Sequence, residues 1–128
     1  MPVQASDPPL PDELVEMVAR RFAALGDPTR VRLLDVLRRR GEASVGELAA
    51  ELDGGYANVA KHLSLLHQQQ ILGRTKQGTK AVYRISDPVV LELCELVCGA
   101  VSTQLRELEA AVSGVLPNSV PSATKGAT

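Results

Sequence analysis

Aromatic residues, cysteines and long apolar runs are all scarce in this chain. Its 128 residues include one Phe, two Tyr and no Trp. Leu, Val and Ala must therefore build the core, which suits packed helices better than an aromatic-rich sheet. No run approaches about 18 uninterrupted apolar residues, and the N-terminus lacks the basic and apolar segments of a signal peptide. We expect a soluble, cytoplasmic, single-domain protein with no membrane partner, in which the two cysteines stay reduced.

Acidic residues are missing from one segment, residues 54–86. That segment holds five basic residues and no Asp or Glu, although the formal net charge of the whole chain is −1. Residues 1–53 carry seven basic against ten acidic side chains, and residues 87–128 carry two against five. Chance can leave a segment of this length without acid. A block of charge +5 on an acidic chain nevertheless favours a surface that faces a polyanion.

The first half of the chain has the pattern of four helices. Apolar residues at helical spacing predict them over about 12–25, 28–40, 45–52 and 57–70. Asp27 caps the second helix ahead of Pro28, and Ser44 with Glu47 forms a capping box for the third. The short third helix, a glycine turn at 53–55 and the fourth helix make a helix-turn-helix pattern. In the second helix we expect a buried stripe of Val31, Leu34 and Leu37.

The second half begins with a change of period. Residues 71–76 and 80–85 are β-capable runs around Gln77-Gly78-Thr79, which is a hairpin signal. A last helix follows from Asp87-Pro88 to about Gly114. The predicted fold is mainly α with a small β-hairpin, in the order α-α-α-α-β-β-α. We expect a domain over 11–115 between a disordered N-terminal segment, 1–10, and a disordered tail, 116–128.

The last helix carries a heptad seam. Its apolar residues from Leu91 to Val115 step alternately by three and four, the period of two helices that lie along each other. We expect a homodimer formed through the first and last helices. The predicted interface residues are Leu14, Val18, Phe22, Leu91, Cys94, Cys98, Val101, Leu105 and Leu108.

A helix-turn-helix followed by a hairpin is a winged helix-turn-helix. Such a unit places its second helix in the DNA major groove and its hairpin on the flanking backbone. The segment without acid contains both parts, where a carboxylate would repel phosphate. The predicted DNA-binding residues are Tyr56, Ala57, Asn58, Lys61, His62, Arg74, Lys76, Gln77, Thr79, Lys80 and Arg84.

Three segments resemble the ArsR/SmtB family of bacterial repressors. FAALGDPTRVRLLDVL (22–37) is similar to the family's Asp-Pro-Thr-Arg signature, NVAKHLSLL (58–66) to its recognition helix and TKQGTKAVYRI (75–85) to its wing. The resemblance covers about residues 12–113. It implies a dimeric winged-helix repressor of transcription that binds an operator in double-stranded DNA until an effector weakens binding. The chain departs from the family's pattern in the recognition helix, at Gly55, Tyr56, Val59 and Ala60, and at Gln70, where the family usually has glycine.

Neither well-known metal site of that family is matched here. Ser44-Val45-Gly46 stands where the thiolate site has Cys-Val-Cys. Asp87 is present at the other site, but Val89, Ala100 and Thr103 stand where histidines are expected. Asp87 is therefore interpreted as a helix cap. His62 and His67 are five residues apart, too far around a helix to bind one ion, and His67 is interpreted as a surface residue.

Cys94 and Cys98 leave two interpretations open. At spacing i, i+4 the sulfurs share a helix face and could bind a thiophilic metal or metalloid, or act as a redox switch. Cysteine is also a common buried packing residue, and both lie on the apolar seam. No cofactor is required on either interpretation, and the effector stays unassigned.

The sequence predicts a DNA-binding transcriptional regulator. We find no nucleophile–base pair, phosphate-binding glycine loop or metal-ligand cluster, so we do not expect an enzyme. A thiol-based sensor that uses Cys94 and Cys98 is the alternative within this class. The alternative of another class is a winged-helix protein-interaction module without specific DNA binding, for which Tyr56 and Ala60 are the only support.

Overall fold

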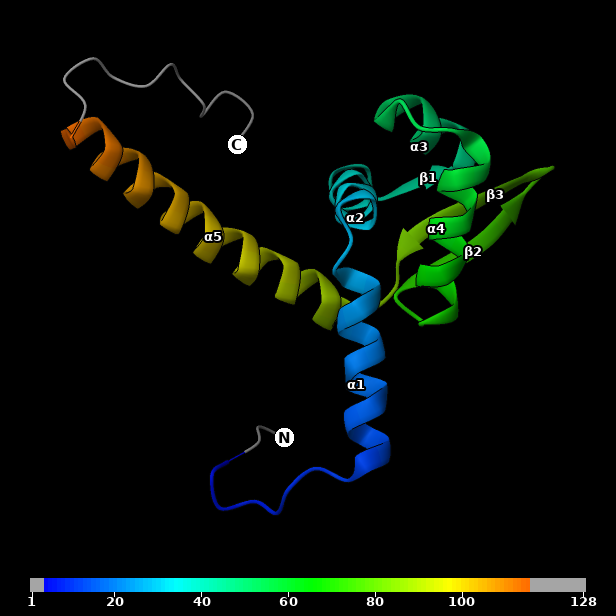
Figure 1. Ribbon diagram of the computed structural model, residues 1–128. Helices are drawn as coiled ribbons and strands as arrows, with labels where there is room; N and C mark the ends of the chain where they lie inside the picture. Colours follow the sequence, from blue (N-terminus) through cyan, green and yellow to red (C-terminus); the bar gives the residue numbers. More distant parts are fainter. Residues whose placement is uncertain (1–3, 116–128) are drawn as a thin grey trace. The chain divides into compact units, whose positions relative to one another are not determined.

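The computed structural model describes residues 4–115, and the predicted tail at 116–128 lies outside them. The chain divides after Asp87 into a first unit and a second unit that contains the last helix. The helices are α1 (Asp12–Leu25), α2 (Pro28–Arg40), α3 (Val45–Leu52), α4 (Tyr56–Gln68) and α5 (Pro88–Val115). The strands are β1 (Glu42–Ser44), β2 (Leu72–Gln77) and β3 (Lys80–Ile85) (Figure 1).

The helix starts follow the local signals in the sequence. The Asp27 carboxylate accepts from the Arg30 backbone N–H at 3.1 Å, and Pro28 occupies the first turn of α2. At α3, Ser44 and Glu47 form a complete capping box, which satisfies two backbone donors that the helix itself leaves unpaired. These caps fix where α2 and α3 begin, and hence where the helix-turn-helix lies.

The sheet has one strand more than the sequence predicts. Residues Glu42–Ser44 form β1, which pairs antiparallel with β3, so the strand order is β1-β3-β2. Ala43 and Ser44 are buried in it. A three-residue strand is too short to show a period-2 pattern, and it forms because β3 supplies the hydrogen-bonding partner.

The core of the first unit is aliphatic, as the scarcity of aromatics indicates. Fully buried leucines come from α2, α3 and α4, and Ile71 and Leu72 continue the core into the sheet. The expected stripe on α2 is partly wrong. Leu34 and Leu37 are buried together with Leu33 and Val36, but Val31 is 47% exposed.

Helix α5 forms the described part of the second unit. Its 28 residues make it the longest helix of the described chain. By length and composition alone, Pro88–Gly114 could also cross a membrane, which is weak evidence for a span. The test for an uninterrupted apolar run missed this, because mean hydropathy tolerates the isolated Glu92 and Glu95.

Candidate DNA-binding interface

The turn between α3 and α4 sets the direction of the recognition helix. Asp53 ends α3 in the left-handed conformation with φ 52°, which Asp tolerates better than most residues. The Asp53 and Gly54 backbone N–H groups both donate to the Ala49 carbonyl. Helix α4 then begins at Tyr56 and buries Val59, Leu63 and Leu66. Its opposite face is thereby left to the solvent.

The predicted contact residues of α4 lie on that outward face. Tyr56 is 64% exposed. Ala57, Asn58 and Lys61 are exposed as well. The Lys61 ammonium makes no hydrogen bond or ion pair with any described residue. This cation is therefore available to an external anion.

His62 differs from its neighbours because it has a partner inside the protein. Its Nδ1 lies 3.0 Å from Nη1 of Arg30, while Arg30 Nε and Nη2 donate to the carbonyls of Ala24 and Ala23 at 2.6 and 3.2 Å. A guanidinium can only donate, so Nδ1 accepts and the neutral ring carries its proton on Nε2. Arg30 thus links the end of α1 to the recognition helix. In the sequence Arg30 stands out only as the arginine of the Asp-Pro-Thr-Arg signature. Its contacts with Ala23, Ala24 and His62 could not be predicted from the residues next to it in the chain.

The hairpin cations divide between two faces. In the β2–β3 register Arg74 is opposite Tyr83 and Lys76 is opposite Ala81, whereas Lys80 is opposite Gln77. Directly opposed residues share a face, so Arg74 and Lys76 lie on one side of the hairpin. The other side of the hairpin carries Lys80, Arg84 and Gln77, with Val82 between Lys80 and Arg84 along β3. The turn is Gly78-Thr79, with Gly78 at φ 66° and all of Gln77, Thr79 and Lys80 exposed.

One carboxylate joins the second face of the hairpin. Glu42 of β1 is opposite Arg84 in the β1–β3 register, and its Oε2 accepts from Nε2 of Gln77 at 3.3 Å. The predicted basic surface is free of acid along the chain, but in space an acid lies beside it. The face with Arg74 and Lys76 is therefore the more positive of the two, and Tyr83 on that face makes an edge-to-face contact with His67 of α4.

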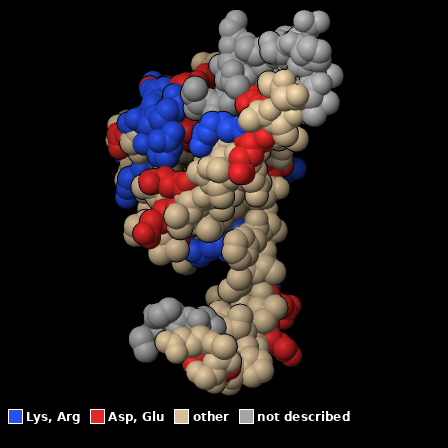
Figure 2. Space-filling model, turned by 90° about the vertical axis from the view of Figure 1, so that its left-hand side faces the viewer, with Lys and Arg blue, Asp and Glu red and all other residues tan. Residues whose placement is uncertain are grey.

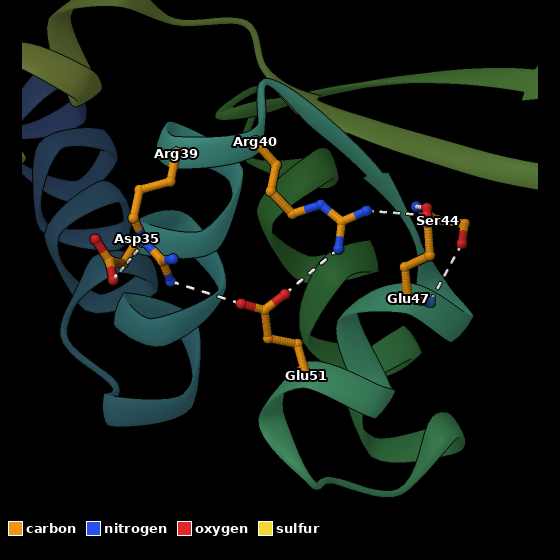
Figure 3. Close-up of polar contacts among 6 residues, drawn as sticks. All are labelled: Asp35, Arg39, Arg40, Ser44, Glu47 and Glu51. Carbon is orange, nitrogen blue, oxygen red and sulfur yellow. Dashed lines mark hydrogen bonds and ion pairs between the residues drawn. The ribbon is translucent and has the colours of Figure 1, made fainter.

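The arginines at the end of α2 are paired with carboxylates, in contrast to Lys61 and the hairpin cations. Arg38 pairs with Asp35 at 2.7 Å. Arg39 also pairs with Asp35, at 3.4 Å, and Arg40 pairs with Glu47 and Glu51 at 2.9 and 3.3 Å (Figure 3). Arg39 also reaches Glu51 at 3.8 Å. The four hairpin cations make no ion pair with any described residue. Lys61 of α4 and the hairpin cations are therefore open to an external anion, while carboxylates offset the charge of these α2 arginines.

The far end of α4 is held by contacts that the sequence did not reveal. Arg21 of α1 donates to the Gln69 carbonyl at 3.0 Å and pairs with Asp87 at 2.7 Å. His67 Nδ1 lies 3.0 Å from the Leu72 carbonyl. His67 is exposed, as interpreted from the sequence, and this contact also ties α4 to β2.

The predicted interface residues of α1 are exposed in the single chain. Leu14 is 42%, Val18 39% and Phe22 57% exposed. Figure 2 shows the surface of α1, in the lower part of the view, as mostly tan, with the red acidic groups at its edge. A soluble helix rarely leaves such a stripe in water.

The heptad seam of α5 is apolar and largely exposed. Val101 is 53%, Leu105 39% and Leu108 62% exposed. Cys98 is exposed and Cys94 is half-buried, as is Leu91. Both predicted interface helices thus carry exposed apolar side chains at these positions.

The two cysteines are free thiols. Burial, and secondarily the neighbouring Cys98, raise the pKa of Cys94 above its ordinary value of 9.0, so this thiol stays protonated at neutral pH. Within residues 4–115, no group of three or more His, Cys, Asp or Glu side chains could hold a metal ion. One chain therefore offers two sulfur ligands at most.

Comparisons with known proteins agree with this geometry. A helix-turn-helix domain family matches residues 25–72. An uncharacterised HTH-type transcriptional regulator of Methanocaldococcus jannaschii is 35% identical over 85 residues, which are 66% of this chain and 96% of that protein. The crystal structure of the antimony-specific transcriptional repressor AntR aligns with a TM-score of 0.70 and 33% identity, over 81% of this chain and 93% of that one.

A further solved structure names the family. It is a homodimeric winged helix-turn-helix DNA-binding domain from Mycobacterium bovis, a possible ArsR-family regulator, with a TM-score of 0.71 and 26% identity over 81% of this chain and 95% of that one. The chain belongs to the ArsR/SmtB family. An ArsR/SmtB protein is a DNA-binding regulator of transcription and not an enzyme, so the predicted fold class and function class are confirmed.

Proposed function

We propose that this ArsR/SmtB protein is a homodimeric repressor that binds an operator with α4 in the major groove and the hairpin on the flanking backbone. The observation that supports this most directly is the sorting of charge. Lys61 and the hairpin cations have no partner in the described chain, while the arginine run of α2 is paired with carboxylates. Because the target is DNA, we expect the protein to act in the cytoplasm.

A binding assay tests the proposal. Fluorescence anisotropy of the reduced protein would compare the DNA upstream of its own gene with a scrambled duplex at three salt concentrations. We expect selective binding that weakens steeply with salt, since each neutralised phosphate contributes a log–log slope of about −0.9. Lys61→Ala should weaken binding, and Arg38→Ala should not, because Arg38 already pairs with Asp35. Equal, weak binding to both duplexes would instead favour the protein-interaction module.

The second copy is supported by the uncovered apolar faces. Exposed apolar side chains on α1 and α5 need a partner surface, and the Mycobacterium bovis neighbour is a homodimer. An identical chain supplies the same heptad seam, so the two α5 helices can pack along each other. A lipid bilayer is the other conceivable cover for α5, and it is an outcome of the dimerisation test described in the Discussion.

A thiol-based effector site at Cys94 and Cys98 is the second candidate. The similar repressor AntR is antimony-specific, and this chain has two free thiols at spacing i, i+4. Each thiol would lose its proton as the sulfur binds the ion, so the raised pKa of Cys94 makes binding weaker as pH falls. Two chains would supply four sulfurs.

The effector candidate has its own experiment. Antimony(III) or mercury(II) would be titrated into the protein–operator complex, with wild type and the Cys94→Ser/Cys98→Ser variant compared. Release of the wild type alone supports the thiol site. Release of both proteins by the same concentration shows that the effector acts elsewhere.

A further inference from the structure

An open hollow lies where the first turn of α2 meets the start of α4. Thr29 and Arg32 line it from α2, Gly54 from the turn and Asn58 from α4. Its volume is about 220 Å³. One water occupies about 30 Å³ in the liquid, so the hollow has room for a larger polar group such as a phosphate.

The polar side chains of the hollow lack partners in the described chain. The Arg32 guanidinium, the Thr29 hydroxyl and the Asn58 amide make no hydrogen bond to another described residue. Among the described residues, no carboxylate lines the hollow. A guanidinium with a hydroxyl and an amide beside it supplies several hydrogen-bond donors, which is the chemistry that binds a phosphate oxygen.

The arginines of helix α2 differ in their surroundings, and Arg30 is held by His62 and two backbone carbonyls. In its last turn Arg38 pairs with Asp35 of the same helix. Arg39 and Arg40 are held by carboxylates of α2 and α3 (Figure 3). Arg32 lies six residues earlier and is exposed without a carboxylate partner. The difference matters because the carboxylates beside Arg38, Arg39 and Arg40 offset the positive charge that an external anion would meet, whereas no carboxylate of the described chain pairs with Arg32.

The hollow lies on the side of α4 away from the hairpin. Helix α4 packs against α2 and against β2. In Figure 1 the tip of the hairpin lies on the opposite side of α4 from α2. A helix in the major groove has a phosphate backbone along each side of it, so the hairpin can reach only one of the two strands.

We propose that Arg32, together with Thr29 and Asn58, binds a phosphate of the operator backbone on the side of α4 opposite the hairpin. This inference rests on the proposed operator binding and adds a contact outside the basic segment 54–86. The contact is to the backbone, so it strengthens binding to every sequence and contributes nothing to selectivity.

The test is the salt dependence of DNA binding by matched arginine variants. Anisotropy titrations with the upstream duplex and the scrambled duplex would compare wild type, Arg32→Ala, Arg32→Lys and Arg38→Ala. Both alanine variants remove one positive charge from the same helix, so long-range electrostatics change alike. We expect Arg32→Ala to weaken binding to both duplexes by about tenfold and to reduce the salt slope by about 0.9. Arg32→Lys should keep most of the slope, and Arg38→Ala should match wild type.

Each outcome has a separate meaning. If Arg32→Ala keeps the slope and affinity of Arg38→Ala while wild type still selects the upstream duplex, the phosphate contact is refuted and the proposed function stands. If Arg32→Ala loses selectivity at an unchanged slope, Arg32 contacts a base and the inference is also refuted. Failure of wild type to select the upstream duplex refutes the proposed function itself. Circular dichroism of each variant would verify that it is folded.

Discussion

Gln70 occupies a backbone conformation that suits glycine better than glutamine. Its φ is 61°, and its backbone N–H donates to the His67 carbonyl at 2.9 Å, where the chain leaves α4. A side chain in the left-handed region costs roughly 1–2 kcal/mol, while glycine gains some entropy in the unfolded chain. The chain therefore ends α4 in a backbone conformation that the Gln70 side chain makes less favourable.

We expect Gln70→Gly to raise the free energy of unfolding by about 0.5–1 kcal/mol. Urea denaturation followed by circular dichroism would measure it. Gly78→Ala is the matched control, because Gly78 also has positive φ, 66°, and should lose stability when it gains a side chain. A stability loss in Gln70→Gly would mean that the Gln70 side chain contributes more than its backbone conformation costs.

At this scale the sequence predicts which residues face the solvent better than which residues meet. Tyr56, Asn58 and Lys61 are exposed, as expected for the outward face of an amphipathic helix. His62 lies beside Arg30, which is 32 positions away in the chain. Such a contact depends on how α2 packs against α4, and no local pattern in the sequence encodes it.

At the scale of helices and strands, β1 changes the electrostatics of the hairpin. It brings Glu42 opposite Arg84, although the two residues are far apart in the sequence. The helices and the hairpin were predictable because their caps, turn and periodicity are local. Strand β1 could not be predicted from the sequence, because three residues form a strand only when a strand from elsewhere in the chain pairs with them. The count of acids along the chain therefore overstated how uniformly positive the hairpin is.

We expect Glu42→Gln to strengthen DNA binding a few-fold at low salt. The change removes a negative charge beside Arg84 and Gln77, and its effect should fade as salt screens the interaction. Anisotropy titrations with the upstream and scrambled duplexes at two salt concentrations would measure it. Unchanged affinity at low salt would show that this face of the hairpin does not approach the DNA.

The capping box of α3 makes that helix sensitive to acid. The Ser44 backbone N–H holds the pKa of Glu47 below its ordinary value of 4.5, with help from the Ser44 hydroxyl and Arg40. A carboxyl whose pKa is lower in the folded protein stabilises the fold above the unfolded pKa. That contribution is lost as pH falls through the folded pKa. Stability should therefore decline below pH 4.5 in part through Glu47.

Glu47→Gln tests this contribution. The amide oxygen can still accept from the Ser44 backbone N–H, but it does not titrate. We expect the variant to be less stable than wild type at pH 7 and to lose less melting temperature between pH 5 and about pH 3. Thermal denaturation across that range would show it, and parallel profiles for the two proteins would refute the assignment.

At the scale of the whole molecule, charge and apolar surface are assigned to different elements. Lys61 of α4, the hairpin cations and Arg32 of α2 make no ion pair within the described chain, whereas the exposed apolar residues of the predicted dimer interface lie on α1 and α5. The sequence predicted this division from the segment without acid and from the heptad seam. One surface is suited to a polyanion and the other to a second copy, so dimer formation and DNA binding use different parts of the chain.

Leu105→Glu should therefore disrupt the dimer. Leu105 lies on the seam and is 39% exposed in the single chain. Two carboxylates facing each other in an apolar interface should raise the dimer dissociation constant by about a hundredfold or more. Analytical ultracentrifugation would measure the assembly, and operator affinity should fall with it because each chain contacts only one half-site.

Ala110→Glu is the control for charge and for helix position. It introduces the same carboxylate on the same helix, five residues after Leu105 and hence about 140° further around the helix axis, away from the seam. This variant should remain dimeric. If wild type is monomeric in buffer and binds liposomes of neutral lipid, the exposed face of α5 is a membrane surface and the second copy is the wrong partner. If wild type and Ala110→Glu are dimers that do not bind the liposomes, and only Leu105→Glu dissociates, the seam is the dimer interface.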